Sequence, residues 1–207
     1  MATSIVQEIR QNKISITYIF LKRCMDVFVT VLLLPVVIPL LAIIFPVIYL
    51  TSEGPVIFKQ QRVGLLGKVF TIYKIRTMIY TKKGYTGYTV QNDKRITAVG
   101  VLLRKLKLDE LPQLLNVIRG QMSLVGPRPE RVDIVLNCVK QNNFYQYRHQ
   151  VKPGMTGWAQ VNKPTATPCE NFQKLPYDLY YIYNFSFILE MQILIRTMGI
   201  VLSMKGL

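Results

Sequence analysis

The adjacent carboxylates Asp109 and Glu110 are the residues whose types and spacing best suit chemistry on a phosphate. An apolar repeat of helical spacing begins directly after them, which places both acids at the positively polarised start of a predicted helix. Two neighbouring carboxylates can divide the work, because one can attack phosphorus while the other binds Mg²⁺. Acids are equally common at a helix start as plain caps, so the pair alone leaves both interpretations open.

Basic residues that could bind a phosphate lie near this pair in the sequence. Arg128 stands between Pro127 and Pro129, whose fixed φ angles stiffen the segment, so its guanidinium can grip a phosphate with little further loss of entropy. The plain alternative is a proline-rich connector with an exposed arginine. Asp178, which lies among tyrosines, is either a second metal ligand or a partner for an arginine. Further cations lie upstream of the pair: Lys74, Arg76, Arg104, Lys105 and Lys107.

The balance of side chains narrows the functions that this chain can have. Its 26 basic and 11 acidic residues give a formal net charge of +15, which favours an anionic partner such as nucleic acid, anionic lipid or a phosphorylated substrate. The sequence has neither zinc-finger spacing nor a basic heptad helix, so we expect no nucleic acid. A single histidine, His149, rules out a His₂ or His₃ metal site within the chain, and three scattered cysteines form no disulfide framework. Acid–base or nucleophilic chemistry therefore falls on the few carboxylates.

Residues 27–50 are uncharged and almost wholly apolar, which is long enough for a helix to cross a bilayer. Pro35, Pro39 and Pro46 interrupt this run, and each removes a backbone donor from a helix. Basic residues flank the run on both sides, and the positive-inside rule then favours a cytoplasmic location for both flanks. We therefore expect a helix–break–helix hairpin that enters one leaflet and returns. The alternative is a kinked helix that spans the bilayer.

The remaining patterns predict an α+β fold that is mainly helical. Residues 55–60 and 68–74 are predicted strands, joined by a loop at Gly64 and Gly67. Residues 81–93 are polar and glycine-rich, and we expect a surface loop there. Charges inside the last apolar segment favour an interfacial or core helix over a second span. Apolar spacing predicts three helices: one that begins near Leu111 and is closed by Gly120, one at 131–142, and one at 185–204.

Several segments match known motifs in a fixed order along the chain. Lys22-Arg23 and Asp26 precede the apolar run. Further motifs follow it and extend over most of the chain: GPVIFKQQRVG (54–64), FTIYKIRTM (70–78), LDELPQLLNVIRGQMSLVGPRPE (108–130) and VKPGMTGWAQVN (151–162). Together these segments resemble the bacterial sugar transferase family, the monotopic phosphoglycosyl transferases that start glycan assembly on a polyprenol carrier. None of the motifs is decisive alone, but their order and spacing make the resemblance specific.

The resemblance implies a two-step exchange at the bacterial inner membrane, on its cytoplasmic face. Asp109 would attack the sugar-side phosphorus of a UDP-sugar and release UMP, and polyprenyl phosphate would then take the phosphosugar. Glu110 would bind Mg²⁺, with Asp109 as the second candidate ligand. Other positions match polar active-site residues of the family and would bind the substrate: Lys74, Arg104, Arg128 and Asp178. The sequence indicates neither which sugar is transferred nor the oligomeric state.

The same resemblance implies a re-entrant membrane helix in residues 1–53 and one cytosolic catalytic domain in residues 54–207, with a small β-hairpin and interfacial amphipathic helices. The chain resembles a minimal catalytic form of the family, without the extra spanning helices of larger members. The membrane break is expected at Pro39, although Ile38 stands where the family usually has a serine that can bond a freed carbonyl in lipid. The competing interpretation is a non-catalytic basic membrane anchor that binds anionic lipid or nucleic acid.

Overall fold

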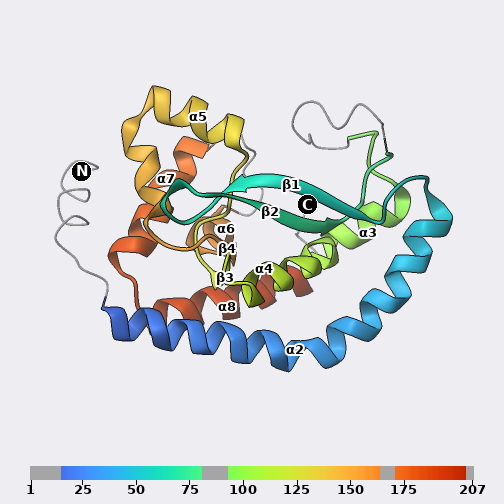
Figure 1. The fold of residues 1–207 in the computed structure, drawn as a ribbon, viewed down its shortest axis with the longest axis horizontal. Coiled ribbons are helices and arrows are strands. Elements are labelled where there is room, and N and C mark those ends of the chain that lie inside the picture. Colours follow the sequence, from blue (N-terminus) through green and yellow to red (C-terminus); the bar gives the residue numbers. More distant parts are fainter. Residues whose placement is uncertain (1–14, 81–92, 164–170, 204–207) are drawn as a thin grey trace.

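The computed structural model describes residues 15–80, 93–163 and 171–203 (Figure 1). A long curved helix runs along one side of the molecule, a two-stranded hairpin crosses above it, and shorter helices pack around the hairpin. The expected loop at 81–93 lies outside the described residues except for Asp93. The elements in chain order are α2 (Ile16–Thr51), β1 (Ile57–Val63), η1 (Leu65–Gly67), β2 (Val69–Ile75), α3 (Ala98–Lys105), η2 (Leu108–Gln113), α4 (Leu114–Ile118), β3 (Ser123–Val125), α5 (Val132–Gln141), η3 (Asn143–Gln150), β4 (Gly154–Thr156), α6 (Trp158–Asn162), α7 (Asn171–Tyr183) and α8 (Phe187–Leu202).

The apolar run forms helix α2, and in the described part of the chain this is the one helix long and apolar enough to cross a membrane. Pro35, Pro39 and Pro46 all lie inside it, and the chain stays helical past each of them. Figure 1 shows that the helix curves along its length. A proline removes a single hydrogen bond and displaces the preceding turn, so spaced prolines can bend a helix without ending it. The structure thus has one continuous, curved helix where the sequence predicted an interruption at Pro39.

Polar contacts fix both ends of α2 to the rest of the fold. Near its start, the Arg23 guanidinium donates to the carbonyls of Val117 (2.5 Å) and Ile118 (2.7 Å) at the end of α4. The Val117 carbonyl also accepts from the Gly120 N–H at 2.9 Å, and a cation is well placed at this C-terminal end of a helix. Near the end of α2, Arg76 donates to the backbone carbonyl (2.7 Å) and the hydroxyl (2.8 Å) of Ser52. One body of protein therefore holds both ends of the long helix.

The hairpin of β1 and β2 is antiparallel, and it confirms the two predicted strands and the turn between them. Ile72 and Ile75 are both almost fully buried although they point to opposite faces of β2. Ile72 belongs to the main core, whereas Ile75 packs with Ile44 and Ile48 of α2 and with Leu103 of α3. The hairpin is therefore covered on both faces, which fixes the position of the polar side chains along it.

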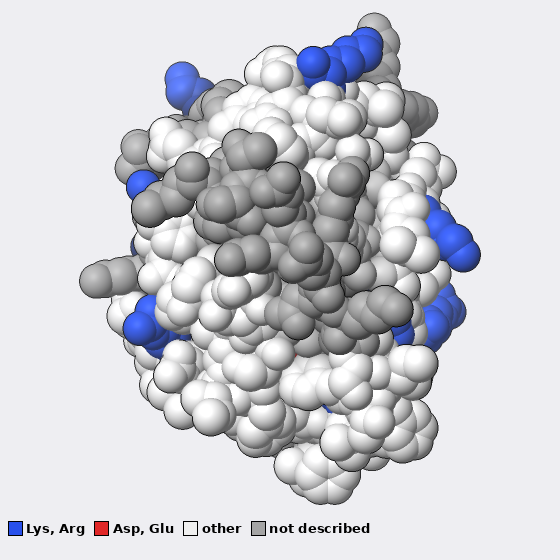
Figure 2. Space-filling model, turned by 90° about the vertical axis from the view of Figure 1, so that its left-hand side faces the viewer, with Lys and Arg blue, Asp and Glu red and all other residues white. Residues whose placement is uncertain are grey.

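Helix α8 confirms the predicted C-terminal helix, and one of its faces is buried while the other is exposed. Leu189, Glu190 and Ile193 point into the protein, and Glu190 pairs with Lys22 of α2 at 2.7 Å. Large apolar side chains remain exposed on this helix: Phe187, Ile188, Ile195, Met198 and Leu202. In Figure 2, Lys and Arg side chains appear around the edges of the face, while its lower part, on the side of α2, is uncharged. An amphipathic helix and an uncharged side together suit a membrane surface.

Two glycines in helices, Gly100 and Gly199, provide a test of how closely α3 packs against the backbone of Thr77. A Cβ on Gly100 of α3 would lie 2.2 Å from the backbone carbonyl oxygen of Thr77, so α3 must approach this backbone without a side chain. A Cβ on Gly199 of α8 would meet nothing within 4 Å. We expect Gly100→Ala to lower the free energy of unfolding by roughly 1–3 kcal/mol or more through forced movement of α3. Gly199→Ala should raise it by up to about 1 kcal/mol, because alanine favours the helix.

Thermal unfolding of both variants in detergent micelles measures the difference. Equal midpoints for the two variants would contradict the close contact between α3 and Thr77.

Candidate active site

The carboxylate pair lies inside a short 3₁₀ turn, η2, and not at the cap of an α-helix. Lys107 ends the preceding α3 region in the left-handed conformation (φ 56°), and its carbonyl accepts a hydrogen bond from the Glu110 backbone N–H at 3.3 Å. Neither Asp109 nor Glu110 caps a helix with its side chain, which removes the plain capping interpretation. The predicted helix is thus a 3₁₀ turn that contains Pro112, and the α-helical part, α4, begins only at Leu114. Gly120 follows α4, as predicted, with a positive φ.

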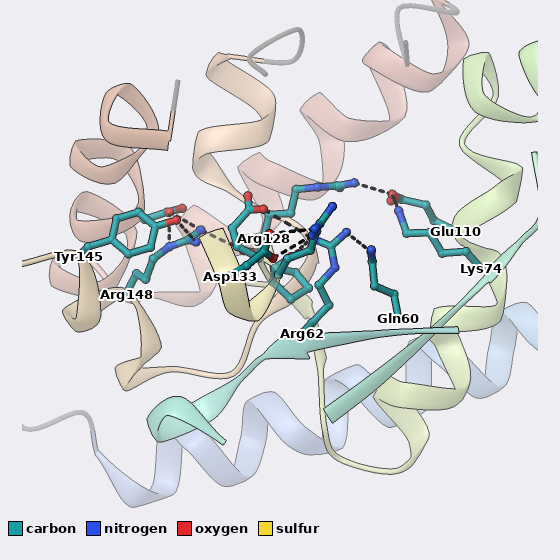
Figure 3. A network of polar contacts seen from close by, with 12 residues as sticks. Gln60, Arg62, Lys74, Glu110, Arg128, Asp133, Tyr145 and Arg148 are labelled. Carbon is teal, nitrogen blue, oxygen red and sulfur yellow. Dashed lines mark hydrogen bonds and ion pairs between the residues drawn. The ribbon is translucent and has the colours of Figure 1, made fainter. Parts of the chain in front are cut away.

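Glu110 is buried and is held by two cations from separate parts of the fold (Figure 3). The Lys74 ammonium on β2 and the Arg128 guanidinium both contact its Oε1, at 2.6 and 2.8 Å. Burial alone would raise the pKa of Glu110, but the charges of Arg128, Lys74 and Lys107 hold it well below the ordinary value. Glu110 is therefore ionised, and its second oxygen forms no hydrogen bond with a described residue.

Asp109 is also buried, yet its surroundings are different. Its carboxylate forms no hydrogen bond or ion pair with any residue in the described ranges. Burial raises the pKa of Asp109, Lys74 opposes this shift, and the neighbouring charge of Glu110 adds to it. One acid of the pair is thus held by two cations, while the other has no partner among the described residues.

Arg104 on α3 is a further cation whose charge acts on Asp109, after that of Lys74. Its Nε donates to the Thr77 hydroxyl at 2.8 Å, which fixes the direction of the guanidinium. Burial lowers the pKa of Arg104, and the charge of Asp109 is the largest opposing influence. The structure therefore gathers Lys74, Arg104 and Arg128 around the pair, three of the four substrate-binding residues expected from the sequence.

The fourth, Asp178, is joined to an arginine and not to the carboxylate pair. Its buried carboxylate pairs with Arg148, with distances of 2.7 Å to Nη2 and 3.0 Å to Nε. Arg148 also donates to the Tyr145 hydroxyl at 2.8 Å and to the backbone carbonyl of Arg128 at 2.9 Å. Asp178 thus acts on the site through Arg148, which corresponds to the second of the two roles that the sequence left open.

Arg62 on β1 holds the same proline-rich segment from the other side. Its Nη1 donates to the carbonyl of Pro129 at 3.0 Å and its Nη2 to the side chain of Gln60 at 2.6 Å (Figure 3). Burial lowers the pKa of Arg62 to about 10, and the charge of Glu130 opposes this shift. Sequence patterns did not indicate Arg62, Tyr145 or Arg148, because each acts on a segment far away in the chain.

The oxygens of the pair suit a magnesium ion that is shared with a phosphate. The described residues contain no group of three or more His, Cys, Asp or Glu side chains that could hold a metal ion alone. Mg²⁺ is often bound by one or two carboxylates together with substrate phosphates. The Asp109 carboxylate and the unbonded oxygen of Glu110 supply donors of this kind, so these residues fit the ion.

Comparison with known proteins places this site in a family. Residues 17–204 match the bacterial sugar transferase family. The chain is a member of the bacterial sugar transferase family. This sugar transferase is 42% identical over 191 residues to a UDP-N-acetylgalactosamine-undecaprenyl-phosphate N-acetylgalactosaminephosphotransferase of Aeromonas hydrophila, covering 91% of this chain and 45% of the relative.

Two further relatives differ from each other in length. The sugar transferase is 43% identical over 188 residues to the sugar transferase EpsL of Bacillus subtilis, covering 90% of each chain. It is 40% identical over 181 residues to a UDP-glucose:undecaprenyl-phosphate glucose-1-phosphate transferase of Escherichia coli, covering 86% of this chain and 39% of the relative. The chain therefore spans less than half the length of two of these three relatives.

The buried pair of Asp178 and Arg148 gives a prediction about stability. Asp178→Asn leaves the Arg148 charge buried without its partner, so we expect a loss of about 3–5 kcal/mol in the free energy of unfolding. Asp133→Asn provides a matched control, because Asp133 pairs with Arg131 at the surface, at a similar distance of 2.8 Å. An exposed pair contributes only about 0–1 kcal/mol. Thermal unfolding in detergent compares the two variants, and equal losses would contradict a special role for the buried pair.

Proposed function

We propose that this sugar transferase moves a sugar-1-phosphate from a UDP-sugar to a polyprenyl phosphate and releases UMP, through a phosphosugar bound to Asp109. The difference within the pair carries the proposal: Glu110 is held by Lys74 and Arg128, whereas Asp109 has no partner in the described part of the chain. The names of two relatives support a UDP-sugar and a polyprenyl phosphate as the substrates. The relatives of Aeromonas hydrophila and Escherichia coli are both named as transferases that act on undecaprenyl phosphate. The sugars in these two names differ, being N-acetylgalactosamine and glucose.

The first step needs an ionised nucleophile and cations near the leaving group. The Asp109 carboxylate oxygen attacks the sugar-side phosphorus, and the bond from this phosphorus to the bridging oxygen breaks. The electron pair leaves with UMP, whose new negative charge is stabilised by the nearby Arg104 and Arg128. Because Glu110 neutralises much of the charge on Lys74 and Arg128, these cations can stay buried in the absence of substrate.

The second step reverses the bond exchange at the same phosphorus. An oxygen of polyprenyl phosphate attacks, the bond to Asp109 breaks, and the aspartate is restored as a carboxylate. The product is a polyprenyl diphosphosugar, the starting unit for a membrane-bound glycan. Mg²⁺ bound by Glu110 and Asp109 would neutralise phosphate oxygens during both steps. A rigid Arg128, held between two prolines and by Arg148, keeps its guanidinium in place for either phosphate.

We further propose that α2 enters one leaflet from the cytoplasmic face of the bacterial inner membrane and returns. Its 36 residues correspond to about 54 Å of helix at about 1.5 Å per residue, which exceeds a hydrocarbon core of about 30 Å. Arg23 and Ser52, near its two ends, both contact the same body of protein. If that body lies on one side of the membrane, both ends of the helix lie on that side too. The helix then enters one leaflet, curves within it and returns.

The nucleophile is tested by Asp109→Asn. Purified protein in detergent with Mg²⁺ should release UMP from at least one of a set of UDP-sugars in an amount that exceeds the enzyme only when polyprenyl phosphate is present. Asparagine is a poor nucleophile of almost the same shape, so UMP release should fall by at least about 10³-fold, with the fold retained. Near-normal turnover of Asp109→Asn would contradict the assigned nucleophile. A non-catalytic anchor would release no UMP and would bind anionic vesicles equally well in both forms.

The topology is tested by labelling introduced cysteines from each side of the membrane. Ser15→Cys and Gln60→Cys would be placed singly in a chain without its natural cysteines, in sealed inner-membrane vesicles of known orientation. Both reporters should react with an impermeant maleimide from the cytoplasmic side, because both ends of α2 lie on one side. Labelling from opposite sides would establish a spanning helix. Disruption of the vesicles with detergent, which should expose both reporters, is the control.

A further inference from the structure

Lys107 has an unusual backbone conformation directly before the carboxylate pair. Its φ of 56° is positive, and Leu66 in the hairpin turn is the one other non-glycine residue with a positive φ in the described part of the chain. A side chain in this region costs roughly 1–2 kcal/mol, since its Cβ approaches a carbonyl oxygen. Glycine or asparagine would adopt it more easily. Strained residues of this kind persist mainly where the surrounding structure or the function requires them.

The side chain of Lys107 lies among the charges of the site without a partner of its own. It is partly buried, and it forms no hydrogen bond or ion pair with another described residue. The carboxylates of Glu110 and Asp109 are the negative charges that act on it, in that order. Its backbone is fixed to the turn that carries both acids, because the Lys107 carbonyl accepts from the Glu110 N–H. The charge of Lys107 thus acts on the pair, while no described residue uses its donors.

The other cations near the pair are already engaged. Lys74 and Arg128 share Glu110 Oε1, and Arg104 uses its Nε on Thr77. The cations that act on the two carboxylates outnumber them, so the site has excess positive charge. Each phosphate of a nucleotide sugar's diphosphate carries a negative charge that such a site would attract. A lysine whose three donors have no partner among the described residues is well placed to contact this group.

We propose that Lys107 is a substrate-binding residue whose ammonium contacts the diphosphate of the nucleotide sugar. This inference rests on the proposed function and adds to it a specific cation for the diphosphate, beyond the residues expected from the sequence. Lys107 is assigned to the donor, since it lies on the same turn as Asp109, whose carboxylate attacks the diphosphate in the first step. The strained backbone lies directly before the two carboxylates, in the turn that carries them.

The experiment is built on Lys107→Asn, because asparagine tolerates the left-handed backbone and the fold is retained while the charge is lost. Calorimetry measures binding of UDP, which keeps the diphosphate, and of uridine, which has none. We expect the Kd of UDP to rise about 10- to 100-fold, the effect of one lost charge-assisted hydrogen bond, with the uridine affinity unchanged. The KM for the UDP-sugar should rise similarly, and the KM for polyprenyl phosphate should stay within about twofold.

Two further variants separate the local charge from other effects. Lys107→Arg keeps the charge and should restore most of the UDP affinity. Lys140→Asn removes the same charge from the exposed end of α5 and should leave UDP binding unchanged, which controls for the net charge of the protein. A UDP affinity of Lys107→Asn equal to that of the natural protein would overturn the proposal, as would equal losses for UDP and uridine.

The two proposals can fail separately. UDP binding is measured without turnover, so weaker binding by Lys107→Asn supports the lysine assignment even if no UDP-sugar yields UMP. If the natural protein releases UMP while Lys107→Asn matches it in UDP affinity and in KM, the lysine assignment fails and the proposed function stands. A change confined to the KM for polyprenyl phosphate would also overturn the assignment, because the lysine would then serve the acceptor.

Discussion

Four consecutive backbone carbonyls, those of residues 127–130, set the geometry on which the rest of the site depends. Each accepts a hydrogen bond of 2.9 or 3.0 Å, and the donors come from three parts of the fold. They are Gly154 N–H of β4, the Arg148 guanidinium of η3, and the Arg62 guanidinium and Val63 N–H of β1, in the chain order of the carbonyls. Two of the four residues are prolines, which have no N–H of their own and a fixed φ. Contacts from the hairpin, η3 and β4 thereby fix the position of Arg128. Arg128 in turn helps to fix Glu110, which it contacts.

This arrangement separates the roles of two neighbouring acids that have the same chemistry in water. Glu110 and Asp109 are both buried, and burial disfavours the charge on each. Contact with two cations overcomes this effect for Glu110, whereas Asp109 receives only partial compensation from Lys74 at longer range. A carboxylate that is weakly stabilised in the free protein has more to gain from contact with a phosphorus centre and its counter-charges. The difference arises from the positions of Lys74 and Arg128 and not from the residue types of the pair.

Local patterns predicted much of this fold, and long-range contacts explain the remainder. Alternating side chains with glycines between them predicted the hairpin, and apolar spacing predicted α5 and α8. The pair and Arg128 could also be selected as candidates, because a stiff proline frame and adjacent acids are visible in the sequence, and the structure brings Glu110 and Arg128 into contact. The 3₁₀ turn was missed, since Pro112 is compatible with the first turn of either helix type. Arg148 and Arg62 could not be found, because each meets the proline segment only after the chain has folded.

The attachment of α2 at both ends has a mechanical consequence for the membrane. In the proposed re-entrant arrangement, its bulk adds area to one leaflet and none to the other, so each inserted molecule strains the bilayer asymmetrically. The strain is relieved where the cytoplasmic leaflet is already stretched. The energy of insertion then depends on local curvature and lateral pressure more than on bilayer thickness. Bilayer thickness matters more for a spanning helix, because a spanning helix must match both membrane surfaces. Arg23 and Arg76 would therefore couple the shape of the membrane to the residence of the enzyme in it.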